Sequence, residues 1–319
     1  MMAQSSAWVI GAGLVQVVAF VLVAPLLVGL MRTVRCRMEG RTGPPVTQVW
    51  KDLRKLFAKQ RTQPRDSTVV FSMTPVVLVA TTLVAIWLAP LLTTRVSMGG
   101  GSDLFAVVFL LLMGSVSMSL AALDTATAFG GMGASRLMTI VALAEPALLV
   151  AILALAAPLH SSSLAVIFAT ALHHPVWVAT PQRLLSLGAF LIVILAESGR
   201  LPVDNPASHL ELTMIHEALF LEYSGPDLAL VVLGENLRLA FMLALLANLY
   251  APWGFATAAG GWPILIGLAA MLAKLVVLAA VIGAVEVGMA KLRLFRIPEL
   301  LAGAFMLSIL AVVSALVIA

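Results

Sequence analysis

Long apolar runs separated by polar segments constrain this chain more than any other feature. Eight runs are long enough to cross a hydrocarbon core of about 30 Å as helices that rise 1.5 Å per residue. Helices are favoured because a lipid-embedded segment must satisfy its own backbone hydrogen bonds. The runs cover residues 8–31, 69–92, 104–123, 137–157, 177–196, 228–250, 262–287 and 298–319. The sequence therefore predicts an all-α polytopic membrane protein with about eight transmembrane helices.

Composition supports a single integral-membrane domain over residues 1–319. The chain is 61% hydrophobic and 11% charged, whereas soluble globular domains carry about 25% charged residues. The first run lacks a preceding basic segment and is interpreted as a true span rather than a cleaved signal peptide. Residues 164–172 form an apolar run too short to cross, which either lies in the interface or re-enters the membrane.

The distribution of Lys and Arg predicts the orientation. Ten of the nineteen basic residues lie in the first loop, residues 32–65. Altogether the odd-numbered loops carry fifteen basic residues and the even-numbered loops carry two. Because basic loops remain in the cytoplasm, the odd-numbered loops are expected there and both termini outside. The expected location is a cell membrane.

The first loop is predicted to contain an amphipathic helix after Gly43-Pro44-Pro45. Apolar residues recur with helical spacing at Val46, Val49, Trp50, Leu53, Leu56 and Phe57. The opposite face carries Gln48, Lys51, Asp52, Lys55 and Lys59. Such a helix either rests on anionic lipid headgroups or presents a docking surface to a cytoplasmic partner and covers a cavity beneath it.

The fifth loop, residues 197–228, is unusually acidic. Between Glu197 and Glu235 lie seven of the fifteen acidic residues, together with His209 and His216. Imidazole titrates near neutral pH, which favours proton exchange here. A metal site is not expected, because His216-Glu217 lacks the second histidine of a zinc motif and no third ligand has a fixed spacing. The single Cys36 excludes an iron–sulfur cluster held by this chain.

Several charged residues fall within or beside the predicted spans. A charge at bilayer depth costs about 2.5–3.5 kcal/mol and usually faces a bundle interior or an ion path. Lys274, near the middle of its span, needs a carboxylate or a hydrated cavity, and Glu145 is one candidate partner. Glu286 is expected to be an interfacial or snorkelling residue. The spacing of Glu235 and Arg238, and of Glu197 and Arg200, allows ion pairs on one helical face. Such pairs could instead only lock helices together.

Two further charged residues lie on either side of a glycine-rich segment. Asp124 and Arg136 bracket residues 130–133, which are expected to form a turn that either charge could cap or pin.

Three motifs together resemble the subunit 1 family of respiratory complex I, which includes membrane subunits of energy-converting nickel–iron hydrogenases. The first is Arg41-Thr42-Gly43-Pro44 followed by Gln48, Asp52, Lys55 and Lys59. The second is Glu197-x2-Arg200-x-Pro202-x-Asp204, continued by Glu211-Leu212 and Glu222-Tyr223-Ser224-Gly225. The third is Glu145 in the fourth span. The resemblance covers nearly the whole chain.

The fifth loop departs from the quinone-using branch of that family. Ala207 and His209 stand where that branch carries acidic residues. The run from His209 to Thr213, then His216-Glu217, is similar to the hydrogenase branch, which serves nickel–iron hydrogenases and formate-hydrogenlyase-like complexes. Leu123-Asp124 and residues 131–136 agree with that branch. The departure argues against a bound quinone.

The resemblance implies eight tilted helices in the lipid bilayer beneath a peripheral redox arm. It implies partners that are hydrogenase large and small (iron–sulfur) subunits and antiporter-like membrane subunits. The nickel–iron centre and iron–sulfur clusters would be on partner subunits, and this chain would bind no cofactor. Nucleic acid is not an expected partner.

The function expected from these observations is that of a non-catalytic, membrane-anchoring and ion-coupling subunit of such a complex. The expected ion pathway consists of Glu145, Glu197, Arg200, Asp204, Glu211, Glu217, Glu222, Glu235, Arg238 and Lys274. The expected partner interface consists of Arg41, Gln48, Asp52, Lys55, Lys59, Asp124, Arg136, His209 and His216. Either protons or sodium ions could move. The alternatives are a quinone-chamber subunit of a complex I-like dehydrogenase and a stand-alone secondary transporter, although no internal repeat supports the latter.

Overall fold

The computed structural model describes residues 2–93, 102–173, 180–204, 214–256 and 260–318. Seven helices are long and apolar enough to cross a membrane. They are α1 (Met2–Met38), α3 (Val69–Leu88), α4 (Leu104–Asp124), α5 (Ala128–Ala156), α9 (Gly225–Tyr250), α10 (Gly261–Gly288) and α11 (Ile297–Ile318). Within the described ranges the ordered elements are helical, which confirms the predicted all-α membrane fold.

Four shorter helices are present in the described ranges. They are α2 (Gln48–Phe57), α6 (Leu164–His173), α7 (Pro181–Glu197) and α8 (His216–Phe220), with 3-10 turns η1 (Ala157–Leu159) and η3 (Leu294–Arg296). The expected fifth span corresponds to α7, which has 17 residues and follows a stretch outside the described residues. The number of eight spans therefore remains a prediction.

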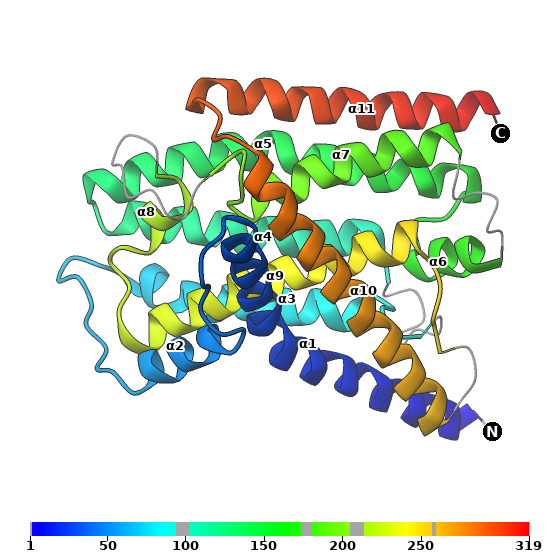
Figure 1. Cartoon of the computed structure of the whole chain (residues 1–319), viewed down its shortest axis with the longest axis horizontal. Coiled ribbons are helices and arrows are strands. Elements are labelled where there is room, and N and C mark those ends of the chain that lie inside the picture. Colours follow the sequence, from blue (N-terminus) through cyan, green and yellow to red (C-terminus); the bar gives the residue numbers. More distant parts are fainter. Residues whose placement is uncertain (1, 94–101, 174–179, 205–213, 257–259, 319) are drawn as a thin grey trace.

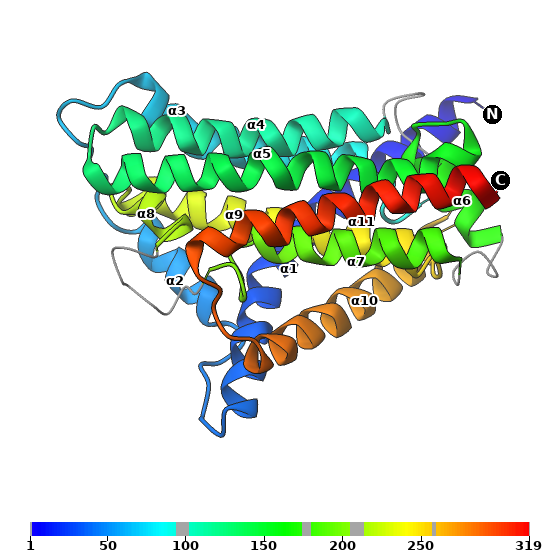
Figure 2. The same cartoon turned by 90° about the horizontal axis from the view of Figure 1, so that it is seen from above.

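The helices form an elongated bundle with two distinct ends. α4, α5, α7 and α11 run along its length, whereas α1 and α10 cross at an angle (Figures 1 and 2). Both termini lie at the end that contains α6, and α2 and α8 lie at the opposite end. The loops that carry the motif residues of the first and fifth loops thus meet at the α2–α8 end.

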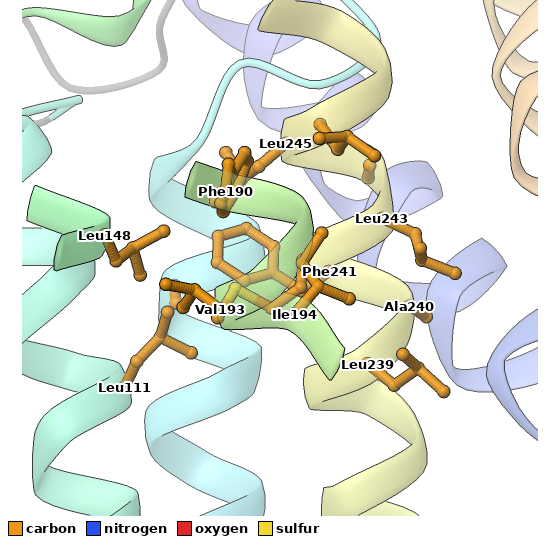
Figure 3. Packing of buried hydrophobic residues seen from close by; sticks show 14 of the residues in the cluster. Leu111, Leu148, Phe190, Val193, Ile194, Leu239, Ala240, Phe241, Leu243 and Leu245 are labelled. Atoms are coloured by element: carbon orange, nitrogen blue, oxygen red, sulfur yellow. The ribbon is translucent and has the colours of Figure 1, made fainter. Parts of the chain in front are cut away.

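Helix α9 occupies the centre of the core. Its residues from Asn236 to Leu249 are buried on every side, which a helix can be only if its neighbours surround it. Figure 3 shows Phe190 and Val193 of α7 packed against Phe241 of α9. Polar side chains carried by α9 are consequently held inside the bundle.

The helix predicted in the first loop is confirmed as α2. Its apolar Val49 and Leu53 are buried, and the indole nitrogen of Trp50 donates a hydrogen bond to the carbonyl of Leu22 at 3.1 Å. Gly29 of α1 has no side chain and therefore allows the backbone carbonyl of Val46 to approach closely. These contacts fix α2 against α1, with its charged face exposed.

The turn predicted at residues 130–133 is wrong, because these glycines lie in the first turns of α5. The chain reverses earlier, at Ala126, which has a φ of 52°. Thr127 caps α5 by accepting a hydrogen bond from the Gly130 nitrogen at 3.2 Å. A Cβ at Gly133 would lie 3.0 Å from the Cβ of Ala218 in α8. The glycine there serves close helix packing rather than a reversal of the chain.

Candidate functional site

A buried ionic cluster joins four helices near the middle of the bundle. Arg238 of α9 donates from Nη2 to Glu197 Oε2 of α7 at 2.9 Å and to Glu145 Oε1 of α5 at 3.3 Å. Its Nη1 donates to Ser115 Oγ of α4 at 2.5 Å. Glu145, Glu197 and Arg238 are 3%, 5% and 6% exposed. The predicted Glu235–Arg238 ion pair is wrong, because the guanidinium turns away from its own helix toward three neighbours.

This cluster holds two carboxylates and one guanidinium. Both carboxylates accept from the same nitrogen, so they lie next to each other. Glu145 Oε2, Glu197 Oε1 and Arg238 Nε are buried and have no hydrogen-bond partner among the described residues. Buried polar atoms are rarely left unpaired, so these atoms mark a place where a proton or a water molecule would be favoured.

A second ionic group lies nearer the α2–α8 end. Arg200 Nη1 donates to Glu286 Oε1 of α10 at 3.2 Å, and Arg35 Nη1 of α1 is 3.8 Å from Glu286 Oε2. The predicted Glu197–Arg200 pair is therefore wrong. Glu286, two residues before the end of α10, is buried at 2% exposure, and its expected place near the membrane interface stays a prediction. Burial lowers the pKa of the Arg200 guanidinium, an effect that Glu286 opposes.

Asp204 organises a third group. Its carboxylate accepts from Lys291 Nζ at 3.1 Å and from the backbone nitrogen of His216 at 3.2 Å. Burial alone would raise the pKa of Asp204, but His216 and Lys291 outweigh burial and lower it to about 2. Asp204 is thus ionised at neutral pH and holds the start of α8 and residue 291 together.

A cavity of about 430 Å³ lies between these groups. Its titratable lining consists of Arg32, Arg35, Arg200, Asp204, His216, Glu217, Glu235 and Glu286. A separate void of about 10 Å³ is lined by Glu197, Arg238 and Ser115, which is near the lower limit for one water molecule. His216 and Glu235 line both spaces. These two residues therefore connect the cavity to the buried cluster.

Lys274 lies in a different environment from the one predicted. Its Nζ donates to Asn248 Oδ1 at 3.0 Å and lies 4.9 Å and 5.3 Å from the ring centroids of Trp253 and Phe255. Asn248 in turn donates to the carbonyl of Leu91 at 2.9 Å. The predicted Lys274–Glu145 pair is wrong, because Glu145 is bonded to Arg238. The ion-pathway role of Lys274 stays a prediction.

The predicted partner residues fall into two groups. Arg41, Asp52, Lys55 and Lys59 are exposed, and half-buried Gln48 donates to Asp52 Oδ1 at 2.8 Å. An exposed face of this kind is what docking would require, and docking itself stays a prediction.

Asp124 and Arg136 have partners inside the chain. Asp124 accepts from the nitrogen and the hydroxyl of Thr68 at 2.7 and 2.9 Å, which fixes the start of α3 to the end of α4. Arg136 Nη1 donates to the carbonyl of Met214 at 2.7 Å, which holds the segment before α8 on α5.

The remaining predicted residues are more peripheral. Glu222 is exposed and Glu217 is half-buried at the cavity. His209 and Glu211 lie outside the described residues. In the part of the chain that the structure describes, no group of three or more His, Cys, Asp or Glu side chains is arranged to hold a metal ion.

Sequence reasoning missed Ser115 and Asn248, which are the neutral partners of Arg238 and Lys274. Each is a polar residue whose immediate neighbours in its helix are apolar residues or glycine. That contrast was a usable signal, because a buried cation needs hydrogen-bond acceptors nearby.

Comparison with known proteins adds three findings. A family model described as NADH dehydrogenase matches residues 11–319. Formate hydrogenlyase subunit 4 of Escherichia coli (strain K12) is 32% identical over 303 residues, covering 95% of this chain and 97% of the relative. Hydrogenase-4 component C of the same organism is 34% identical over 241 residues, covering 76% of this chain and 75% of the relative.

A solved structure shares the fold. A chain of the membrane-bound sulfane sulfur reductase, an archaeal respiratory membrane complex, superimposes with a TM-score of 0.80. It has 19% sequence identity, and the match covers 96% of this chain and 99% of that chain.

Proposed function

The chain belongs to the NADH dehydrogenase family, and from that premise we propose that it is the membrane-anchoring, ion-coupling subunit of an energy-converting nickel–iron hydrogenase or formate-hydrogenlyase-like complex. Two relatives with at least 32% identity carry hydrogenase and formate hydrogenlyase names. The observation that carries the ion-coupling part is that His216 and Glu235 line both the charged cavity and the small void beside the buried Glu145–Arg238–Glu197 cluster.

In this proposal, ions enter at the cavity and pass inward through carboxylates. Asp204, Glu217 and Glu222 lie at or near the α2–α8 end, and Glu211 belongs to the same acidic loop. Glu235 lines both the cavity and the small void, and beyond it lie Glu197 and Glu145. Arg200 and Arg238 would set the charge balance, because a guanidinium remains protonated while the carboxylates exchange protons.

We place the α2–α8 end in the cytoplasm and both termini outside. The basic first loop, with ten of the nineteen Lys and Arg residues, supports this orientation. The hydrogenase large and small subunits would dock on the exposed charged face of α2 and carry the nickel–iron centre and the iron–sulfur clusters. Antiporter-like membrane subunits would receive the ions laterally.

A quinone-chamber subunit of a complex I-like dehydrogenase is the second candidate. The cavity volume of about 430 Å³ falls in the range of sites for small organic molecules. Its lining combines eight titratable side chains with apolar ones such as Phe220 and Val232, so it suits ions and water as well as a ring compound. Protection of the cavity from chemical labelling by a quinone analogue would support this candidate.

The experiment compares Glu145→Gln and Glu197→Gln with the exposed control Glu299→Gln in membrane vesicles that contain the assembled complex. Glutamine keeps the shape but cannot exchange a proton. Ion translocation and the redox reaction are measured separately. We expect translocation to fall roughly tenfold or more in the two buried variants and to stay at the wild-type level in the control. Unchanged translocation in both buried variants would refute the proposed pathway.

A further inference from the structure

We propose that His216 is the residue that transfers protons from the cavity to the buried carboxylates. The inference rests on the function proposed above and names one specific carrier in it. His216 is the first residue of α8 and lines both the cavity and the small void next to Glu197, Glu235 and Arg238. A side chain at this position borders both spaces while its backbone stays in α8.

The ring of His216 is buried without hydrogen bonds. Neither Nδ1 nor Nε2 has a hydrogen-bond partner among the described residues, and the side chain is 12% exposed. Nδ1 is 3.6 Å from Asp204 Oδ2, which is beyond hydrogen-bond distance. A histidine with a purely structural role normally donates or accepts at least one such bond. Nε2 has no partner among the described residues, and Nδ1 faces the Asp204 carboxylate without a hydrogen bond to it. A proton carrier needs such a ring, because one nitrogen accepts a proton while the other releases one.

The backbone around His216 is held in place by contacts with three other segments. The His216 nitrogen donates to Asp204, and Arg136 holds the carbonyl of Met214. Gly199 has a φ of 59°, and a Cβ there would lie 2.8 Å from Nδ1 of His216. The absence of a side chain at Gly199 therefore leaves the space that the imidazole occupies.

Proton transfer through the ring takes two steps. Neutral His216 accepts a proton from the cavity at one ring nitrogen and becomes a cation. The N–H on the other nitrogen then breaks, and its proton passes to an ionised carboxylate, Glu235 or Glu197. The ring becomes neutral again with its proton on the opposite nitrogen, and rotation or tautomerisation resets it. Groups that influence these steps are Asp204, Glu217, Glu197, Glu235, Arg238, Arg136, Arg200, Arg32, Arg35 and Glu286.

The test is proton translocation by the assembled complex that carries His216→Ala, with and without added imidazole. We expect a loss of roughly tenfold or more and partial recovery when imidazole is added, because the cavity has room for that molecule. Methylated imidazoles of different pKa should restore translocation to an extent that depends on their pKa. A merely structural histidine would show no such dependence.

Two further variants make the result decisive. His173→Ala removes an exposed imidazole at the other end of the bundle and is expected to behave as wild type with and without imidazole. His216→Asn keeps a polar side chain that cannot titrate and covers the case in which the alanine variant fails to assemble. Full translocation in His216→Asn would overturn the proposal. If Glu145→Gln blocks translocation but His216→Asn does not, the role of His216 is refuted and the proposed function stands. If neither variant changes translocation, the proposed function is refuted as well.

Discussion

Arg238 is the residue on which the buried charge balance depends. It bonds two carboxylates and one hydroxyl, each from a different helix. Desolvating charges is expensive, so such a group is stable only when every member remains paired. Removal of the single cation would leave Glu145 and Glu197 next to each other with no positive charge in contact.

We expect Arg238→Gln to destabilise the protein by about 3–5 kcal/mol, the usual cost of breaking a buried pair on one side. Arg238→Lys keeps the charge but loses the forked geometry and should cost less. Adding Glu197→Gln to Arg238→Gln should restore part of the loss, because one uncompensated carboxylate is removed. Thermal unfolding of the purified complex in detergent measures all three. A double variant no more stable than Arg238→Gln alone would contradict this account.

At the residue scale, the sequence predicts the important residues more reliably than it predicts the contacts between them. Glu145, Glu197 and Arg238 were all singled out because charges in apolar helices need partners. The predicted pairings relied on spacing within one helix, which cannot report contacts between helices. The contacts of Glu286 escape prediction for the same reason, since its partners Arg200 and Arg35 come from segments far away in the chain.

Helix α8 depends on the first turns of α5 for its position. Its five residues are too few to be stable alone, so contacts with α5 must hold it. Gly133 allows close approach of Ala218, and Arg136 holds the carbonyl of Met214. The placement of His216 at the cavity follows from these contacts.

The glycines of α5 provide a matched pair of variants. At Gly133, a Cβ would contact Ala218 at 3.0 Å and the carbonyl of Ile215 at 3.4 Å, whereas at Gly131 it would meet nothing within 4 Å. We expect Gly131→Ala to be neutral or to stabilise by about 0.5–1 kcal/mol, as alanine does within a helix. Gly133→Val should push α8 away and lower both the unfolding temperature and ion translocation. Equal behaviour of the two variants would show that α8 is not held in this way.

The elements themselves were partly predictable. Hydrophobic periodicity located α2 within a polar loop, and apolar length located the long helices. The glycine-rich start of α5 was interpreted as a turn because glycine usually interrupts helices. Its actual role, close contact with α8, involves a segment some eighty residues away and leaves no local pattern in the sequence.

At the scale of the whole molecule, polar side chains gather in two separate regions. The cavity and the Arg238 cluster extend inward from the α2–α8 end, and the Lys274–Asn248 contact lies toward the α6 end of α9 (Figure 1). The apolar runs could predict the membrane fold because burial in lipid depends on composition alone. They could not predict this division, which depends on how α9 and α10 cross.

The last prediction decides whether the ion path ends at Glu145 or continues to Lys274. Lys274 contacts the Asn248 amide and two aromatic rings, and none of these can accept a proton at neutral pH. We therefore expect Lys274→Met to retain ion translocation within roughly twofold of wild type, far from the loss expected of Glu145→Gln. Asn248→Leu, which breaks the same contact from the other side, is the matched control. Vesicle translocation assays compare the three, and a loss in Lys274→Met as large as that in Glu145→Gln would extend the path across the subunit.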